Sequence, residues 1–425
     1  MAVVRCTIPP LRDRHSHPLL YAALMDAVDL NRPGESRESA LERIRAVAAA
    51  GNSAWTIATG WNSGRFALDK SDFDGLPPIV ILSLSIHGLI VNDAGRQVIR
   101  DHDETVAAHL DDQDWIERNL RKVLNLFARA GASPQRLAKF FEHLRALGVH
   151  SAEEMLLVGE DEIELFDEAG LAGRTQFWAA PETYDSASPA NRERIHGIKL
   201  FTDGAIGVTT AALHEKYRTA DHNGMLLYSD TALEALIARY SGQMPMAIHA
   251  IGDAAIDQVV CAVERAALHV PSRQTIRIEH AQFISESTAR RAKALGLHLS
   301  MQPNFSEDSV TYADRLPAGY PARNNPFRML IDRVGFVPGV DLYLGSDGMP
   351  HGVQEALRQS LFPDGGYEGQ VLAIDEFIAG YCHSETTHGS IEIEIDPINR
   401  SVFLRTPAFK SGTHAGSKDP ASRTY

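Results

Sequence analysis

The sequence predicts a (β/α)8 barrel of the TIM type that carries a helical insertion and a small, truncated β appendage formed by the two termini. In the second half of the chain, short apolar stretches alternate with amphipathic helices, which is typical of a parallel sheet. Four successive predicted strands run into polar residues, namely His249, His280, Gln302 and Asp347. A barrel gathers its functional side chains at these strand ends. An open doubly wound sheet would instead need an early glycine-rich phosphate turn, and the sequence has none.

The composition is that of a soluble globular protein and excludes several classes of partner. Of the 425 residues, 44% are hydrophobic and 23% are charged, and the formal net charge is -14. An acidic surplus without a basic cluster argues against nucleic acid and against an anionic membrane as partners. The partner expected is a small-molecule substrate.

The cysteines and the apolar runs indicate a cytoplasmic protein. Cys6, Cys261 and Cys382 are widely separated and form no C-x-x-C pair, so they suggest neither a disulfide framework nor a thiolate zinc site. The N-terminus is interrupted too early, by Arg5 and two prolines, to be a secretory signal. The most apolar run, residues 76–91, falls short of the roughly 20 apolar residues that a membrane helix needs.

The chain begins with a predicted strand over residues 3–7, and two histidines follow closely. His15 and His17 stand at positions i and i+2. In a strand such side chains project to the same face, so both imidazoles can reach one ion.

The next elements are a helix and two candidate barrel strands. An amphipathic helix is predicted over residues 39–50, and Gly51 ends it. Strands are predicted over residues 54–60 and 79–86. The second leads to His87, at the point where a barrel strand would open toward a site.

The pattern changes to helix over about residues 111–148. Within this stretch, Ser133 and Pro134 are an N-cap followed by proline at the first helical position. A further helix is predicted over residues 153–167, where acidic residues alternate with apolar ones. We therefore expect a helical insertion at about residues 104–170.

The second half of the chain repeats a rhythm of strand and helix. Strands are predicted over residues 176–180, 244–249, 275–280, 297–302 and 341–344. Helices are predicted over residues 231–241, 254–268 and 287–295. Between the first two of these strands, residues 197–207 read as an apolar strand entering a glycine-rich turn, with Lys199 in its middle.

Lys199 needs an explanation, because lysine is rarely buried without a partner. Taken alone, the residue allows three interpretations. It could face solvent from a half-exposed strand, form a Schiff base with a substrate, or carry a modified amine that binds metal.

The two ends of the chain are expected to form the β appendage, from residues 1–7 and 386–408. Two alternating runs within residues 389–405 predict a hairpin that pairs with the N-terminal strand. Residues 8–385 are assigned to the barrel. Residues 409–425 are expected to be disordered, since they are rich in small and polar residues.

Six residues at or near the strands of the barrel carry ligand chemistry. They are His15, His17, Lys199, His249, His280 and Asp347. Neutral imidazoles and carboxylates bind first-row divalent metals, zinc above all. A free ammonium has no acceptor, but addition of CO2 to the Lys199 amine would give a carbamate, an anionic ligand with two oxygens that can bridge two ions.

This ordered set of motifs resembles the amidohydrolase superfamily, and within it the amidohydrolase 3 or YtcJ-like branch, which includes N-substituted formamide deformylases. The likeness covers roughly Pro9 to Glu392. The motifs that carry it are H-x-H at His15 and His17, His87-Gly88 followed by Val91-Asn92, K-x-x-x-D-G at Lys199 and Asp203-Gly204, H-A-I-G-D at residues 249–253, R-I-E-H at residues 277–280 and G-S-D at residues 345–347.

The resemblance implies a metal-dependent hydrolase that cleaves a C–N bond of a small amide, formamide, cyclic imide or amidine. It implies one or two zinc ions held by the six residues, with Lys199 as a carbamate. Metal-activated hydroxide would attack the substrate, with Asp347 as the proton shuttle. His87 would contact the substrate or its developing oxyanion, and Asp203 and Gln302 are the other substrate contacts expected.

Several positions depart from the family pattern and keep other functions open. Thr209 and Ala254 replace basic residues, and Phe305 replaces a histidine, so the chemistry transfers better than the substrate. The alternatives are a lyase or decarboxylase on the same metal barrel, a Schiff-base enzyme that uses Lys199, and a catalytically silent barrel. The resemblance also suggests a homo-oligomer.

Overall fold

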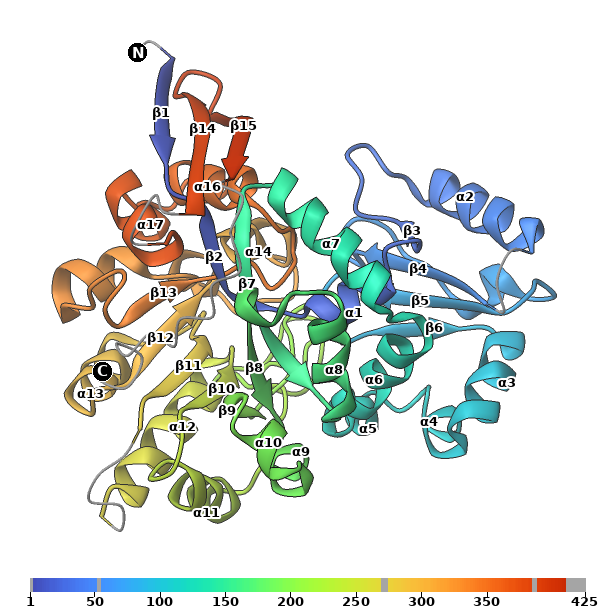
Figure 1. Cartoon of the computed structure of the whole chain (residues 1–425), viewed down its shortest axis with the longest axis horizontal. Helices are drawn as coiled ribbons and strands as arrows, with labels where there is room; N and C mark the ends of the chain where they lie inside the picture. Colours follow the sequence, from blue (N-terminus) through green and yellow to red (C-terminus); the bar gives the residue numbers. More distant parts are fainter. Residues whose placement is uncertain (1–2, 52–54, 269–273, 384–387, 410–425) are drawn as a thin grey trace.

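Eight parallel strands surround a common axis in the computed structural model, with helices outside them (Figure 1). The structure describes residues 3–51, 55–268, 274–383 and 388–409. Neighbouring strands follow the order β13-β12-β11-β10-β9-β8-β7-β2. The first and last of these strands meet at their carboxyl ends, where the Asp347 N–H donates to the carbonyl oxygen of His15 at 2.7 Å. The predicted (β/α)8 barrel is therefore confirmed.

Short strands and a layer of helices build this barrel. The strands are β2 (Leu11–Ser16), β7 (Val149–Leu157), β8 (Thr175–Ala179), β9 (Ile195–Phe201), β10 (Met246–Ala250), β11 (Ile276–His280), β12 (His298–Met301) and β13 (Leu342–Leu344). The helices from β7 onward are α8 (Asp161–Glu168), α9 (Pro181–Ser186), α10 (Pro189–Arg192), α11 (Asp230–Tyr240), α12 (Asp253–Ala266), α13 (Glu286–Ala294), α14 (Asp308–Thr311), α15 (Tyr320–Arg323), α16 (Val353–Leu361) and α17 (Ile374–Tyr381). Among the described residues, none of the helices has the length and apolar character needed to cross a membrane.

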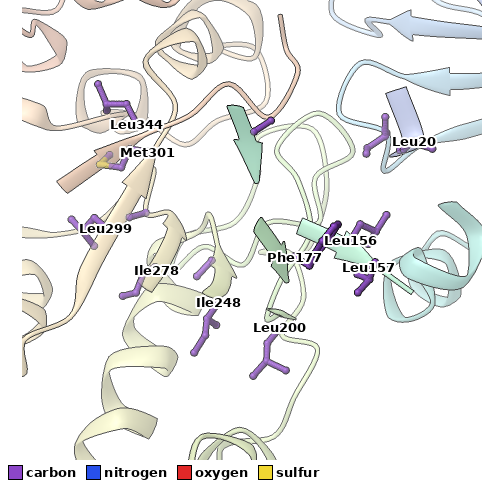
Figure 2. Close-up of a cluster of buried hydrophobic side chains, with 14 of the residues drawn as sticks. Leu20, Leu156, Leu157, Phe177, Leu200, Ile248, Ile278, Leu299, Met301 and Leu344 are labelled. Carbon is purple, nitrogen blue, oxygen red and sulfur yellow. The ribbon is translucent and has the colours of Figure 1, made fainter. Parts of the chain in front are cut away.

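Side chains alternate between the inside and the outside of the barrel. Lys199 pairs with Ala247, which pairs in turn with Arg277, so these three side chains project inward at one level. Residues one position further along point toward the helices and belong to the main apolar core, as Figure 2 shows for Leu200, Ile248, Ile278 and Leu299. The barrel therefore has an apolar outer face and a partly charged interior.

Paired charges occupy that interior. The Arg277 guanidinium donates to Glu153 at 2.9 Å and to Glu279, and all three side chains are buried. The indole N–H of Trp178 also donates to Glu153, at 2.9 Å. Because a buried charge is costly unless it is paired and hydrogen-bonded, these contacts hold the strands β7, β8 and β11 in a fixed relation.

The strands expected over residues 54–60 and 79–86 do not enter the barrel, which corrects their assignment. They form β4 (Thr56–Trp61) and β5 (Ile79–Ser83) of a separate sheet with β3 (Val28–Asp29) and β6 (Leu89–Val91), on the right of Figure 1. Leu41 and Ile44 of the helix α2 (Arg37–Ala50) share a second apolar core with Ile79 and Ile81. A buried apolar run predicts a covered strand but does not identify the sheet that contains it.

Helices complete the segment that joins β2 to β7. They are α1 (Pro18–Ala23), α3 (Asp93–His102), α4 (Glu104–Ala108), α5 (Gln113–Arg118), α6 (Leu120–Gly131) and α7 (Pro134–Ala146). Ser133 caps α7 by accepting a hydrogen bond from the Arg136 N–H, which confirms the predicted start of this helix.

The helix expected over residues 153–167 is wrong in its first half. Residues Val149–Leu157 form the barrel strand β7, and α8 begins only at Asp161. Glu153 and Glu154 resemble the exposed face of a helix in sequence, yet both are buried, because Glu153 pairs with Arg277 and Glu154 accepts the backbone N–H groups of Leu19 and Leu156. A barrel strand therefore lies within residues 104–170, where only helices were expected.

Strands from the two ends of the chain form a small antiparallel sheet. The strand β1 (Val4–Ile8) pairs antiparallel with β14 (Gly389–Asp396), which pairs with β15 (Ser401–Phe409). Ile391, Ile393 and Ile395 of β14 point into the main core. Residues 410–425 of the expected disordered tail lie outside the described residues.

Gly197 of β9 offers a test of the packing inside the barrel. A Cβ atom there would lie 2.4 Å from the Trp178 ring and 2.6 Å from the carbonyl oxygen of Pro245. We expect Gly197→Ala to destabilise the protein by about 1–3 kcal/mol through overpacking, measured as a lower thermal unfolding midpoint. Gly173→Ala is the matched control, because no atom lies within 4 Å of its added Cβ. An unchanged midpoint for Gly197→Ala would contradict the packing described.

Candidate metal centre

His15, His280 and Asp347 come together at the carboxyl end of the barrel. Their candidate ligand atoms all lie within 4.8 Å of one another. The rings of His15 and His280 are 4.6 Å apart between centroids, although these residues belong to β2 and β11. Two imidazoles and a carboxylate form a donor set that suits a first-row divalent metal, so the residues present fit such an ion.

Hydrogen bonds from neighbouring residues orient the two imidazoles. Nδ1 of His15 lies 2.6 Å from the Glu279 carboxylate, and Nδ1 of His280 lies 2.8 Å from Oε1 of Gln302. Because both partners are acceptors, each Nδ1 carries the proton and each Nε2 keeps its lone pair. Burial is the largest cause that lowers the pKa of both rings well below the usual range, which favours the neutral form that a metal requires.

His17 extends this group on one side. Its Nε2 lies 3.2 Å from Oδ1 of Asp347, while its buried Nδ1 has no hydrogen-bond partner within the described part of the chain. The carboxylate of Glu154 is 4.0 Å from that Nδ1. The structure therefore brings both predicted histidines of the H-x-H motif to the same carboxylate.

Asp347 is held as an ionised carboxylate in a left-handed backbone conformation. Burial would raise its pKa, but His15, His17 and Lys199 together lower the pKa to about 2. Its φ is 55°, and that of His280 is 70°. Such angles cost of order 1–3 kcal/mol in residues other than glycine and are concentrated at functional sites.

Lys199 lies beneath these ligands and is only 1% exposed. Its Nζ is 3.4 Å from Nε2 of His15 and 4.9 Å from the centre of the Phe201 ring. No carboxylate oxygen of the described residues lies within ion-pair distance of this amine. Burial lowers its pKa to about 8, with Glu279 and Asp347 opposing that change. The solvent-facing interpretation of Lys199 is therefore wrong.

His249 lies beside the group with its Nε2 turned elsewhere. Its ring is 4.5 Å from that of His280, but Nε2 lies 3.1 Å from the carbonyl oxygen of Gly204 and 3.3 Å from Asp203. His249 is thus adjacent to the other predicted ligands but outside the closest cluster.

Asp203 and Gln302, expected to contact the substrate, are directed to the protein instead. The Asp203 carboxylate accepts backbone N–H groups of Ala212, Ile251 and Gly252, and Gln302 binds His280. Both side chains are fully buried. A strand-end position predicts proximity to a site, whereas the direction of a side chain depends on partners distant in sequence.

A pocket opens directly above the cluster, and His15, His280 and Asp347 are among the residues that line it. His87 lines it, and Nδ1 of His87 lies 2.8 Å from the buried carboxylate of Glu117 on α5. Burial would lower the pKa of His87, but Glu117 raises it overall. The inserted segment therefore supplies one wall of the pocket.

Sequence patterns missed several residues of the site. Glu279 orients His15, and its alternation with Arg277 in β11 could have placed both inside the barrel. Glu117 reads as the solvent face of an amphipathic helix and gives no signal of its partner. Gln282 and Asp308, which line the pocket beyond His280, likewise have no local sequence signal that points to the site.

The fold and the site define a (β/α)8 barrel protein with a centre of histidines and a carboxylate at the ends of its strands. The chain belongs to the amidohydrolase family, whose model matches residues 5–352. The recognition made from the sequence motifs is thereby confirmed.

Two named relatives match part of the chain. YtcJ of Bacillus subtilis (strain 168), whose name places it among the amidohydrolases, is 28% identical in an alignment of 302 residues that covers 62% of this chain and 56% of YtcJ. Protein LONG AFTER FAR-RED 3 of Arabidopsis thaliana is 34% identical over 125 residues, which are 28% of this chain and 21% of that protein. The matched part of the chain thus spans about half of YtcJ and about a fifth of the plant protein.

Two solved structures share the fold. A metal-dependent hydrolase from Pyrococcus horikoshii aligns with a TM-score of 0.64 at 22% identity, covering 89% of this chain and 80% of its own. One from Pyrococcus furiosus aligns with a TM-score of 0.60 at 22% identity, covering 88% and 80%. At this identity the likeness supports the barrel architecture alone.

The donor set predicts a measurable metal content. We expect the purified protein to contain a divalent metal and His280→Ala to lose most of it, because one of the clustered ligands is removed; elemental analysis measures both. His214→Ala is the matched control, since that exposed imidazole pairs with Asp257. Equal metal content in the His280 and His214 variants would contradict the site.

Proposed function

We propose that this protein is a metal-dependent hydrolase that cleaves a C–N bond of a small amide, formamide, cyclic imide or amidine. The observation that carries the proposal is the convergence of His15, His280 and Asp347 at the floor of one pocket. The name of YtcJ, an amidohydrolase, supports the same reaction class.

Asp347 is the proposed proton carrier. A bound zinc or similar ion would polarise the substrate and make water more acidic. The Asp347 carboxylate, with a pKa of about 2, is ionised at neutral pH and can accept the proton of the attacking water. It would then return that proton to the leaving nitrogen.

His87 is the proposed contact for the substrate oxygen. Glu117 holds Nδ1 of this ring, which leaves Nε2 as its other hydrogen-bonding atom. Since Glu117 also raises the pKa of His87, the ring can carry a proton on Nε2 and donate it in a hydrogen bond to an oxygen that gains negative charge.

Lys199 is the proposed carbamate. Its amine is buried without an anionic partner among the described residues, and its lowered pKa favours the neutral form that reacts with CO2. The nitrogen would form a bond to the carbon of CO2 and release one proton. The carbamate so formed would place two oxygen atoms near His15, and these oxygens could serve as metal ligands.

A Schiff-base role for Lys199 has less support. Lys199 is not among the residues that line the pocket above the cluster, and His15 stands next to its amine. A substrate carbonyl in that pocket would have to pass the histidines to reach the amine. A lyase or decarboxylase acting at the same site would be recognised by its products.

The reaction can be tested with a panel of N-formyl and N-acyl amines, with release of the free amine as the measured signal. We expect Asp347→Asn to lower kcat by about 10²- to 10⁴-fold, the usual worth of general acid–base catalysis. Asp221→Asn is the control, because this exposed carboxylate pairs with Lys216. A wild-type rate in Asp347→Asn would rule out the proton-carrier role.

The carbamate can be tested without a substrate. After incubation with ¹³C-bicarbonate, the wild-type protein should give a ¹³C carbamate resonance that Lys199→Ala lacks. Lys122→Ala, at an exposed position paired with Asp103, should keep the resonance. If Lys199→Ala retains full metal content and activity, Lys199 has no part in the centre.

A further inference from the structure

Gln282 and Asp308 form a polar pair on the wall of the pocket. Nε2 of Gln282 donates to Oδ2 of Asp308 at 2.7 Å, and both residues line the cavity next to His280 and Phe305. Nε2 of Gln282 also lies 3.4 Å from the carbonyl oxygen of Phe305, which can only accept a hydrogen bond, so the amide turns its NH2 group to Phe305 and Asp308. That orientation also fixes the position of the Gln282 carbonyl oxygen.

The oxygen atoms of Gln282 and Asp308 can accept more hydrogen bonds than the described residues donate to them. Oε1 of Gln282 is buried without a hydrogen-bond partner, as judged over residues 3–51, 55–268, 274–383 and 388–409. In the same part of the chain, Asp308 makes no ion pair, and Gln282 is the only side chain that donates to it. Buried polar groups normally find partners, so the pair lacks donors that a ligand can bring.

The rest of the pocket brings no lysine or arginine to Asp308, as far as the described residues show. Most of the lining is apolar, with Leu120, Leu124, Ile206 and Tyr312 among its residues. The Phe305 ring stacks on His280 with centroids 5.6 Å apart. Asp308 and Asp347 are the two carboxyl groups among the described residues of this lining, which disfavours anionic ligands beside Asp308 and favours cationic ones.

We propose that Gln282 and Asp308 are a recognition site for a cationic group with at least two N–H donors, such as an ammonium, amidinium or guanidinium, carried on an apolar body. As the substrate class of the enzyme, this inference rests on the proposed hydrolase function. The charged end would bind Asp308 and the Gln282 carbonyl oxygen, while the scissile bond lies toward His280 and Asp347.

The state of the Asp308 carboxyl agrees with this role. Burial raises its pKa to about 7, with the Gln282 hydrogen bond opposing that change and Glu307 adding to it. A cation placed beside the carboxyl would favour its ionised form. The bound ligand would therefore supply the charge that the pocket wall lacks.

Binding of two probes of similar shape to the purified full-length protein tests the inference. Benzamidine carries the cationic N–H donors, and acetophenone has none. By calorimetry we expect the wild-type protein to bind benzamidine at least about tenfold more tightly than acetophenone, and Asp308→Asn to lose about tenfold in benzamidine affinity. Equal affinities for the two probes in the wild-type protein would overturn the proposal.

Two further variants make the result specific. Gln282→Met removes the orphaned oxygen and should also weaken benzamidine binding, which serves the test if Asp308→Asn does not fold. Glu307→Gln removes the same charge one residue away, at a position paired with Arg65 outside this pocket, and should change affinity by less than about twofold. Equal losses in the Glu307 and Asp308 variants would overturn the proposal.

Hydrolysis separates this inference from the proposed function. N-formyl amines whose far end is either an amino group or a methyl group can be compared by kcat/KM. Asp308-dependent binding of benzamidine without hydrolysis of any amide would leave the recognition site standing and remove the proposed reaction. Hydrolysis without any preference for the amino series, together with no benzamidine binding, would support the proposed reaction and overturn the recognition site.

Discussion

The hydrogen bond between Glu279 and His15 joins the interior of the barrel to the residues at its mouth. Glu279 accepts a hydrogen bond from Arg277 through Oε1 and one from Nδ1 of His15 through Oε2. Arg277 also donates to Glu153 of β7. A buried carboxylate with two partners cannot turn without leaving a charge unpaired. The ring of His15 is therefore fixed by the same contacts that fix the strands.

The segment inserted between β2 and β7 forms part of the wall of the pocket above the metal-binding residues. Glu117 of α5 binds His87, and Leu120 and Leu124 of α6 line the same pocket. Thr210, in the loop that follows Lys199, donates to the second oxygen of Glu117 at 2.6 Å. Glu117 thus connects the insertion to the barrel at the pocket, so a structural change in either part would alter the position of His87.

Much of the fold could be predicted because strand ends and helix starts leave local signals. His249, His280 and Asp347 stand at strand ends as expected, and Ser133 caps its helix. The strand β7 could not be predicted from local patterns, because Glu153 is paired with Arg277, more than a hundred residues away, and Glu154 accepts the backbone N–H group of the distant Leu19. The directions of Asp203 and Gln302 escaped prediction for the same reason, since backbone N–H groups and His280 decide them.

The two cations inside the barrel differ in a way that bears on the chemistry of the site. Arg277 of β11 and Lys199 of β9 lie on the same level of the barrel, with β10 between them, and the buried carboxylates of Glu153 and Glu279 both bond to Arg277. Guanidinium stays charged in proteins, whereas an amine can lose its proton when burial makes the charge costly. Of these two side chains only Lys199 can become neutral, and its amine is the one next to His15. The pairing of Arg277 thus leaves a reactive nitrogen below the metal-binding residues.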